Sequence, residues 1–271
     1  MRDTLYANVP FRLSEMPHRY GDNVHLVGNP FLLSQLARLC AKGTMQPEIN
    51  RLVGVLYSDL VKLVINAEFP RKMVAQPTRR VDYTPQGIYH GEVIDPDVRA
   101  VTVNIARAGT LPSQVTYDLL NTTVDPALVR QYHILMSRMI DAQETVVGSN
   151  IGGAKIGGDI DDAFVFFPDP MGATGGSLCT AVSLYKEKVQ GTPRRILSLN
   201  LIVTPEFLRR IKTEHPDVVV YALRLDRGLS PPEVFGTVPG ELWEKERGLD
   251  DRQYIVPGGG GFGEIMNNAY V

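Results

Sequence analysis

The sequence predicts an α/β fold built on a parallel sheet, and the second half of the chain carries the observations that predict it. Residues 196–203 and 218–223 are rich in β-branched residues and leucine, which is typical of buried strands. Between them, Thr204-Pro205-Glu206 supplies an N-cap residue and a proline at the first position of a helix that extends to about Glu214. A strand, a helix and a strand in succession imply a right-handed crossover and parallel strands.

The N-terminal part of the chain indicates an extension followed by two amphipathic helices. Residues 1–23 are polar and irregular, and we expect an extension that packs on a neighbour or stays loose. In residues 31–40 and 49–63, apolar side chains recur at the spacing of amphipathic helices. Residues 77–97 are rich in turn-forming residues.

The middle of the chain indicates two strands and a helix. Residues 101–106 form a short apolar run with Arg107 at its carboxyl end. Residues 113–120 suit a helix, and residues 131–139 indicate the next strand with its exit loop. The glycine-dense segment 148–158 approaches a nucleotide-binding P-loop, but an alanine separates glycine from lysine and no helix follows. We therefore favour a hairpin tip or a mobile flap for this segment.

Residues 164–177 carry the strongest functional signal. Phe-Val-Phe-Phe at 164–167 indicates a buried strand, Asp169 follows its end, and Ala-Thr-Gly-Gly-Ser at 173–177 forms a glycine loop before a helical segment at 178–190. A loop that opens a helix points backbone N–H groups at one spot, where the helix dipole also favours an anion. Because ligands of parallel sheets bind at the carboxyl ends of the strands, Arg107 and Asp169 are expected to share one site. The alternatives are a strand that ends in an acidic turn and a surface arginine paired with an acid.

Composition sets limits on the partners. The formal net charge of −2 over 271 residues leaves no basic face, so we expect no nucleic acid partner. We also expect no membrane span and no secretory signal, since no apolar run approaches about 18 residues. Cys40 and Cys179 are expected to be buried, reduced thiols, which favours a cytoplasmic protein. The histidines show no metal-binding spacing, so no residue is assigned as a metal ligand.

Several motifs, in order along the chain, resemble one enzyme family. Asp-Pro-Met-Gly-Ala-Thr-Gly-Gly-Ser at 169–177 closely resembles the phosphoribosyl pyrophosphate (PRPP) motif of type I phosphoribosyltransferases, and specifically that of the uracil phosphoribosyltransferase family. Arg-Ala-Gly at 107–109 looks like the strand-end motif of that family, and Tyr-Ile-Val-Pro-Gly at 254–258 resembles its uracil loop. Weaker landmarks at 215–218 and 226–229 stand between them in the same order.

The resemblance covers the chain from Val24 to its end and carries expectations about fold and activity. It implies a type I phosphoribosyltransferase fold, in which a parallel, Rossmann-like sheet flanked by helices carries a small hood. The domain would span residues 24–271, with the hood drawn from about 24–99 and 230–271 and an N-terminal extension at 1–23. The implied activity is transfer of phosphoribose from PRPP, with Mg²⁺, to a pyrimidine base, with uracil giving UMP and pyrophosphate in pyrimidine salvage. The family also implies a homodimer.

The resemblance assigns roles to residues of the PRPP motif and of the strand ends. Asp169 would hold the ribose hydroxyls and Arg107 the pyrophosphate, and these two are the expected catalytic residues. A second arginine on a mobile loop reaches the pyrophosphate in the family, and Arg138 is its nearest match here. The residues expected to hold the 5′-phosphate are Ala173, Thr174, Gly175, Gly176 and Ser177.

The base-recognition loop departs from the family pattern. The residues expected to bind the base are Tyr254, Ile255, Gly260, Gly261 and Phe262. Family members usually carry Gly-Asp-Ala-Gly-Asp where residues 260–264 read Gly-Gly-Phe-Gly-Glu, so the first acid is lost and Glu264 replaces the second. The ring of Phe262 could pack or stack, and a family arginine in the first helix aligns with Cys40. Two alternatives therefore stay open: a phosphoribosyltransferase for another base, and a non-catalytic relative that senses PRPP or a pyrimidine.

Overall fold

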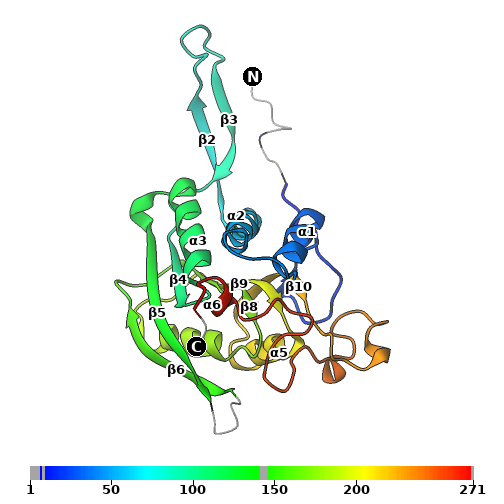
Figure 1. Cartoon of the computed structure of the whole chain (residues 1–271). Helices are drawn as coiled ribbons and strands as arrows, with labels where there is room; N and C mark the ends of the chain where they lie inside the picture. Colours follow the sequence, from blue (N-terminus) through cyan, green and yellow to red (C-terminus); the bar gives the residue numbers. More distant parts are fainter. Residues whose placement is uncertain (1–6, 8–9, 141–145, 270–271) are drawn as a thin grey trace.

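The computed structural model describes residues 7, 10–140 and 146–269, and a largely parallel sheet lies at its centre (Figure 1). The strands are β1 (Val24–Leu26), β4 (Ala100–Ala106), β5 (Val129–Ile140), β6 (Val146–Lys155), β7 (Phe164–Pro168), β8 (Met171–Gly172), β9 (Arg195–Val203) and β10 (Val218–Leu225). Among the described residues their spatial order is β1-β10-β9-β7-β4-β5-β6, and β8 pairs with β9. All these pairs are parallel except β5 with β6. The predicted α/β fold with a parallel sheet is confirmed.

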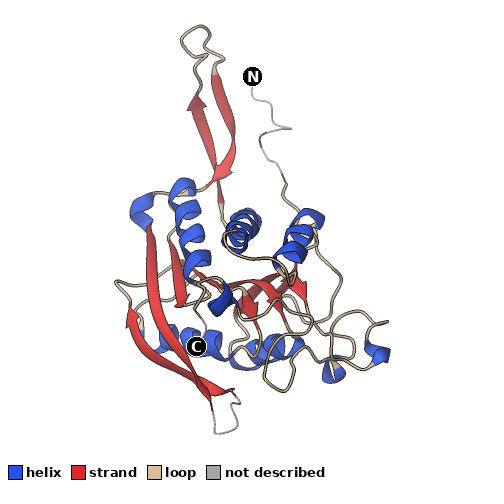
Figure 2. Ribbon diagram, viewed as in Figure 1, coloured by secondary structure: helices blue, strands red, loops and turns tan. Residues whose placement is uncertain are grey.

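Helices cover both faces of the sheet (Figure 2). On one face, α1 (Pro30–Leu39), α2 (Glu48–Glu68) and α3 (Thr110–Thr123) share a buried cluster with Phe164 and Phe166 of β7. On the other face, α4 (Gly176–Lys188) and α5 (Pro205–Glu214) share a second cluster with Val165 and Phe167. Successive side chains of a strand point to opposite faces, so the unbroken apolar run of β7 serves both clusters.

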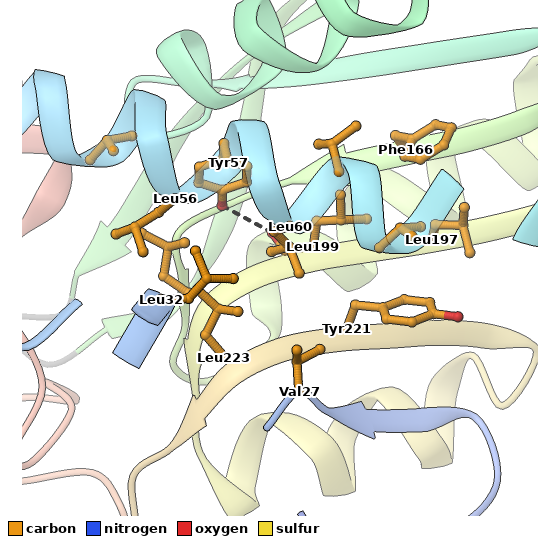
Figure 3. Close-up of a cluster of buried hydrophobic side chains, with 14 of the residues drawn as sticks. Val27, Leu32, Leu56, Tyr57, Leu60, Phe166, Leu197, Leu199, Tyr221 and Leu223 are labelled. Atoms are coloured by element: carbon orange, nitrogen blue, oxygen red, sulfur yellow. Dashed lines mark hydrogen bonds between the residues drawn. The ribbon is translucent and has the colours of Figure 1, made fainter. Parts of the chain in front are cut away.

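The long helix α2 connects the core to the strand end that carries the predicted acid. Its apolar residues recur every three or four positions and are buried against the sheet (Figure 3). From this buried face the hydroxyl of Tyr57 donates a hydrogen bond to the backbone oxygen of Leu199 in β9 at 3.0 Å. The same oxygen accepts the backbone N–H of Asp169 at 3.1 Å. Packing of α2 therefore fixes the backbone at the start of the predicted PRPP motif.

Two hairpins project from the body (Figure 1). The strands β2 (Arg71–Pro77) and β3 (Ile88–Ile94) form a separate antiparallel pair. The prediction of a turn-rich connection at 77–97 missed them, because most of their side chains are exposed and no apolar alternation marks the strands. Residues 148–155 of the glycine-dense segment belong to strand β6, which pairs with β5, so the P-loop alternative is wrong. The favoured interpretation is also wrong for these residues, because they form a strand of a hairpin and not its tip.

The described part of the N-terminal extension packs on its own chain. Met16 donates its backbone N–H to Leu26 at 2.8 Å, and Gly28 donates to Ser14 at 2.8 Å, beside β1. The buried ring of Tyr20 lies edge-on to Trp243. Residues 1–6 and 8–9 of the expected extension lie outside the described residues. The expectation of a loose arm is therefore wrong for residues 10–23.

A segment near the N-terminal end of α2 contacts the C-terminal helix α6 (Phe262–Ile265) and the residue after it. Gln46 donates its side-chain amide to the backbone oxygens of Ile265 and Met266 at 3.2 and 2.9 Å, at the start of α2. This contact joins the two segments that the predicted hood combines, while the hood's exact division stays a prediction. The remaining short elements are η1 (Pro126–Leu128), η2 (Pro232–Val234) and η3 (Trp243–Lys245). None of the described helices has the length and apolar character needed to span a membrane.

Candidate active site

The predicted PRPP loop lies where β7 and β8 lead into α4. Gly175 is the N-cap residue of α4 and has a φ of +77°, a left-handed conformation that glycine adopts without strain. Thr174 closes the turn, because its side-chain oxygen accepts the N–H of Gly176 at 3.3 Å. The N-terminus of the 13-residue helix α4 therefore faces the loop, and its dipole favours an anion there.

The neighbouring β9–α5 connection supports this loop. Thr204 caps α5 and donates its hydroxyl to the backbone oxygen of Ala173 at 2.6 Å. Arg210 of α5 lies over the loop: a Cβ atom at Gly176 would stand 3.2 Å from its Nη1. Its Nε donates to Glu214 at 2.7 Å. Sequence reasoning missed this cation beside the loop, because Arg210 belongs to a different helix and no spacing connects the two segments.

Asp169 occupies the carboxyl end of β7, as predicted. Asn200 donates its side-chain amide to the backbone oxygen of Asp169 at 2.7 Å, and an Asp169 carboxylate oxygen accepts the N–H of Met171 at 3.4 Å. Burial, and then the negative charge of Asp169, raise the pKa of Tyr57 well above its ordinary value. The carboxylate therefore lies close to the core. Residues of β9 hydrogen-bond both the backbone N–H and the backbone oxygen of Asp169.

Arg107 occupies the carboxyl end of β4, which pairs with β7. The peptide bond that joins it to Ala106 is cis. Its Nη1 donates to the backbone oxygen of Ala269 at 2.9 Å, and its Nη2 lies 3.5 Å from a carboxylate oxygen of Glu264. The arginine is thus paired with an acid, as the alternative interpretation has it, but that acid belongs to the predicted base loop. The pairing brings the two predicted subsites together.

The lack of a side chain at Gly109 allows the turn after β4, which contains Arg107, to approach β7 closely. A Cβ atom at this glycine would lie 2.8 Å from the backbone oxygen of Ile105 and 3.2 Å from that of Pro168. Gly109→Ala is therefore expected to lower the free energy of unfolding by about 1–3 kcal/mol, because rigid backbone atoms must move to admit the methyl group. Urea denaturation measures the change.

A matched glycine supplies the control for that substitution. Gly54 lies inside α2, and a Cβ atom there would meet nothing within 4 Å. Gly54→Ala is expected to raise the free energy of unfolding by about 0.5–1 kcal/mol, since alanine loses less conformational entropy in a helix. If both variants change the free energy of unfolding in the same direction, the predicted cost of a methyl group at Gly109 is contradicted.

Arg138 is the predicted residue whose side chain lies outside the described residues. Its backbone belongs to β5, opposite Ser149 of β6. Its role stays a prediction.

The predicted base loop forms an ordered turn before the short helix α6. Ile255 is buried and bridges to Leu249, whereas Tyr254 is 41% exposed. Gly260 is exposed with a φ of +89°. Gly261 is the N-cap residue of α6, and a Cβ atom there would collide with the carboxylate of Glu264. The loop therefore presents backbone at Gly260, while the Glu264 side chain fills the space beside Gly261.

Phe262 packs and does not present its ring to solvent. It is 2% exposed and belongs to the same apolar cluster as α1 and α2. A Cβ atom at Gly259 would lie 2.9 Å from its ring, so the loop rests directly on it. Of the two roles considered for Phe262, packing is the one that the geometry supports. The sequence named Glu264 as the replacement for the second acid of the loop, but its pairing with Arg107 was not predicted.

Comparisons with known proteins identify the family of the chain. A family model described as uracil phosphoribosyltransferase matches residues 29–242. A uracil phosphoribosyltransferase from Dictyoglomus turgidum is 29% identical over 243 residues, which cover 90% of this chain and 98% of that protein. Another, from Variovorax paradoxus, is 29% identical over 209 residues, which cover 77% of this chain and 90% of the relative.

A solved structure supports the fold independently. The structure of the AQ2163 protein from Aquifex aeolicus aligns with a TM-score of 0.68 at 20% identity, and the alignment covers 92% of this chain and 99% of that chain. At this identity the similarity concerns the arrangement of helices and strands. It extends over nearly the whole length of both proteins.

Proposed function

Because the chain belongs to the uracil phosphoribosyltransferase family and is a phosphoribosyltransferase, we propose that it uses uracil as its acceptor. In that reaction the bond from the ribose C1 of PRPP to pyrophosphate breaks and a bond to N1 of uracil forms, giving UMP. The observation that supports this most is the contact of Arg107 with Glu264 and Ala269. It joins the predicted pyrophosphate residue to the base loop within one site.

The PRPP half of the proposal assigns roles to groups that the fold already holds in place. Positive charge develops on the ribose as pyrophosphate leaves, so fixed charges and dipoles do most of the work. The carboxylate of Asp169 would hold the ribose hydroxyls through charge-assisted hydrogen bonds. Backbone N–H groups of residues 173–177, with the hydroxyls of Thr174 and Ser177, would hold the 5′-phosphate. Arg107, and as a further proposal Arg138, would bind the pyrophosphate in the forked geometry of arginine.

The base half of the proposal relies on backbone groups. The peptides at Ile255 and Gly260 would hydrogen-bond the polar edge of the pyrimidine, and the exposed Gly260 supports this because no side chain covers its backbone. Tyr254 and Gly261 would complete the loop around the base. With glycine at 261, the carboxylate of Glu264 is the acidic group beside that residue.

The donor set also fits Mg²⁺ bound together with PRPP. Asp169 is followed by Pro170, so the protein offers a single carboxylate at this turn and the other ligands must come from the substrate and water. Carboxylate and phosphate oxygens are the ligands that Mg²⁺ prefers, and it usually keeps several waters. We therefore propose that the ion is held through the substrate's oxygens, with Asp169 as the nearest acid. When bound, it would neutralise charge on the leaving pyrophosphate.

We further propose a homodimer and a cytoplasmic location. The β2–β3 hairpin supports the dimer, because four exposed apolar side chains lie along a segment that stands away from the body (Figure 1): Met73, Ile88, Tyr89 and Val93. Sedimentation velocity gives the mass that tests it. The free thiols of Cys40 and Cys179 support a reducing compartment, which cell fractionation tests.

The experiment that tests the acceptor measures pyrophosphate release from PRPP and Mg²⁺ with a panel of bases. We expect release with uracil, and mass spectrometry should identify UMP as the product. Reactions without a base provide the background. Release with a different base alone would contradict uracil as the acceptor. PRPP binding without release for any base would contradict the proposal as a whole and favour a sensing relative.

A further inference from the structure

An ion pair at the end of β10 is bonded to a single residue of the base loop. Arg224 donates through Nε and Nη2 to the two carboxylate oxygens of Asp226 at 2.6 and 2.7 Å. Asp226 is 2% exposed. It accepts the backbone N–H of Gly258 at 2.8 Å, and Arg224 donates to the backbone oxygen of Gly258 at 2.9 Å. Both backbone polar groups of Gly258 are therefore held by side chains of opposite charge.

The position of Gly258 makes this contact important for the loop. Gly258 lies between Ile255 and Gly260, the two residues proposed to present backbone to the base. It has a φ of +59°, and a Cβ atom there would collide with the backbone oxygen of Ile255. Residues 258–261 are four glycines in succession, which lose more conformational entropy on ordering than any other residue type. A loop of this composition needs external contacts to keep one shape.

The side chain of Cys40 packs against the same loop. A Cβ atom at Gly259 would lie 2.8 Å from the sulfur of Cys40, so the loop rests on α1's C-terminal cap residue. Burial raises the pKa of the Cys40 thiol, although the nearby Arg224 opposes that shift. The sulfur that faces Arg224 is therefore uncharged at neutral pH, and the carboxylate of Asp226 is the counter-charge that orients the guanidinium.

We propose that Arg224 and Asp226 are positioning residues that hold the glycine loop in the shape in which it binds the base. This proposal rests on the proposed function of that loop. The guanidinium fixes the carbonyl of Gly258, the carboxylate fixes its N–H, and the peptides on either side are set relative to the strand ends that carry Arg107 and Asp169. Arg224 acts through the backbone of Gly258 and Asp226 does the same, so neither needs to touch the base.

The first test compares Arg224→Met with Arg252→Met. Methionine keeps an unbranched apolar stem and removes the donors, while Arg252 is an exposed arginine in the turn just before the loop. In the ligand-free protein, hydrogen exchange at the amides of residues 258–261 is expected to become at least about tenfold faster in Arg224→Met, because a charge-assisted hydrogen bond is lost. Arg252→Met is expected to exchange at the wild-type rate. Wild-type exchange in Arg224→Met would overturn the proposal.

The second test separates the base from PRPP. Arg224→Met is expected to raise the KM for uracil about tenfold or more, with kcat little changed, because the site must first order its loop. The Kd for PRPP, measured by calorimetry without a base, is expected to stay at the wild-type value. An equal loss of affinity for both substrates would indicate general damage and overturn the positioning role.

A conservative variant keeps the test decisive when Arg224→Met does not fold. Arg224→Lys keeps a positive charge near Asp226 but cannot bond the carboxylate and the Gly258 carbonyl as a fork. We expect intermediate exchange and an intermediate KM for uracil. Wild-type values of both would overturn the requirement for the guanidinium. If the wild-type enzyme accepts no base, the proposed function fails, yet the exchange measurement still decides whether the pair holds the loop.

Discussion

Asp169→Ala is expected to lower the rate of pyrophosphate release by about 100- to 1000-fold, the range seen when one preorganised group that stabilises transition-state charge is removed. The carboxylate stands at the end of β7 on a backbone that Leu199 and Asn200 hold from β9. Alanine leaves this backbone frame intact, so the loss is expected in kcat as well as in KM. Steady-state kinetics with uracil and PRPP measure both.

Two further variants identify the source of that loss. Asp169→Asn keeps the size of the side chain and removes its charge, so we expect a loss of activity close to that of alanine. Asp22→Ala removes a carboxylate from an exposed turn and is expected to retain wild-type activity. An Asp169→Ala enzyme with wild-type kcat and KM would show that the acid is a structural end of the strand.

The relative positions of the predicted PRPP residues could be inferred from sequence because most of them are contiguous. Asp169 and residues 173–177 lie within nine positions, and the strand and helix on either side fix their directions. Arg107 lies about sixty positions away, but it could be placed at the same edge because it also ends a parallel strand. Local pattern and sheet topology were sufficient in both cases.

The parts that sequence reasoning missed depend on contacts between distant segments. Arg210 approaches the predicted phosphate loop from α5, and Glu264 contacts Arg107 from a segment 157 positions further along the chain. No spacing rule encodes either contact. Strands β2 and β3 lack a buried face, so the alternation that marks strands is absent. Phe262 could not be assigned to packing or stacking until its burial against α1 and α2 was known.

Arg107→Ala is expected to lower kcat/KM for PRPP by about 100-fold, because a bidentate cation for the pyrophosphate is lost. Arg12→Ala is the control, because it removes an exposed arginine that is distant in sequence from Arg107. We expect this variant to keep wild-type kinetics. Calorimetry with pyrophosphate alone measures the same contact without the base. Unchanged pyrophosphate affinity in Arg107→Ala would contradict the assigned role.

A second variant tests the same role, and its expected effect on pyrophosphate affinity is opposite in sign. It changes Glu264, the acid that pairs with Arg107. In the proposed role of Arg107, pyrophosphate replaces the carboxylate of Glu264, which lies 3.5 Å from Nη2. Glu264→Gln removes the charge of that competitor and keeps its shape, so pyrophosphate is expected to bind tighter, by up to about fivefold for a partly exposed ion pair. General damage to the fold would weaken binding in both variants. Weaker binding in Arg107→Ala together with tighter binding in Glu264→Gln would therefore identify the guanidinium as the shared partner of the loop acid and the substrate.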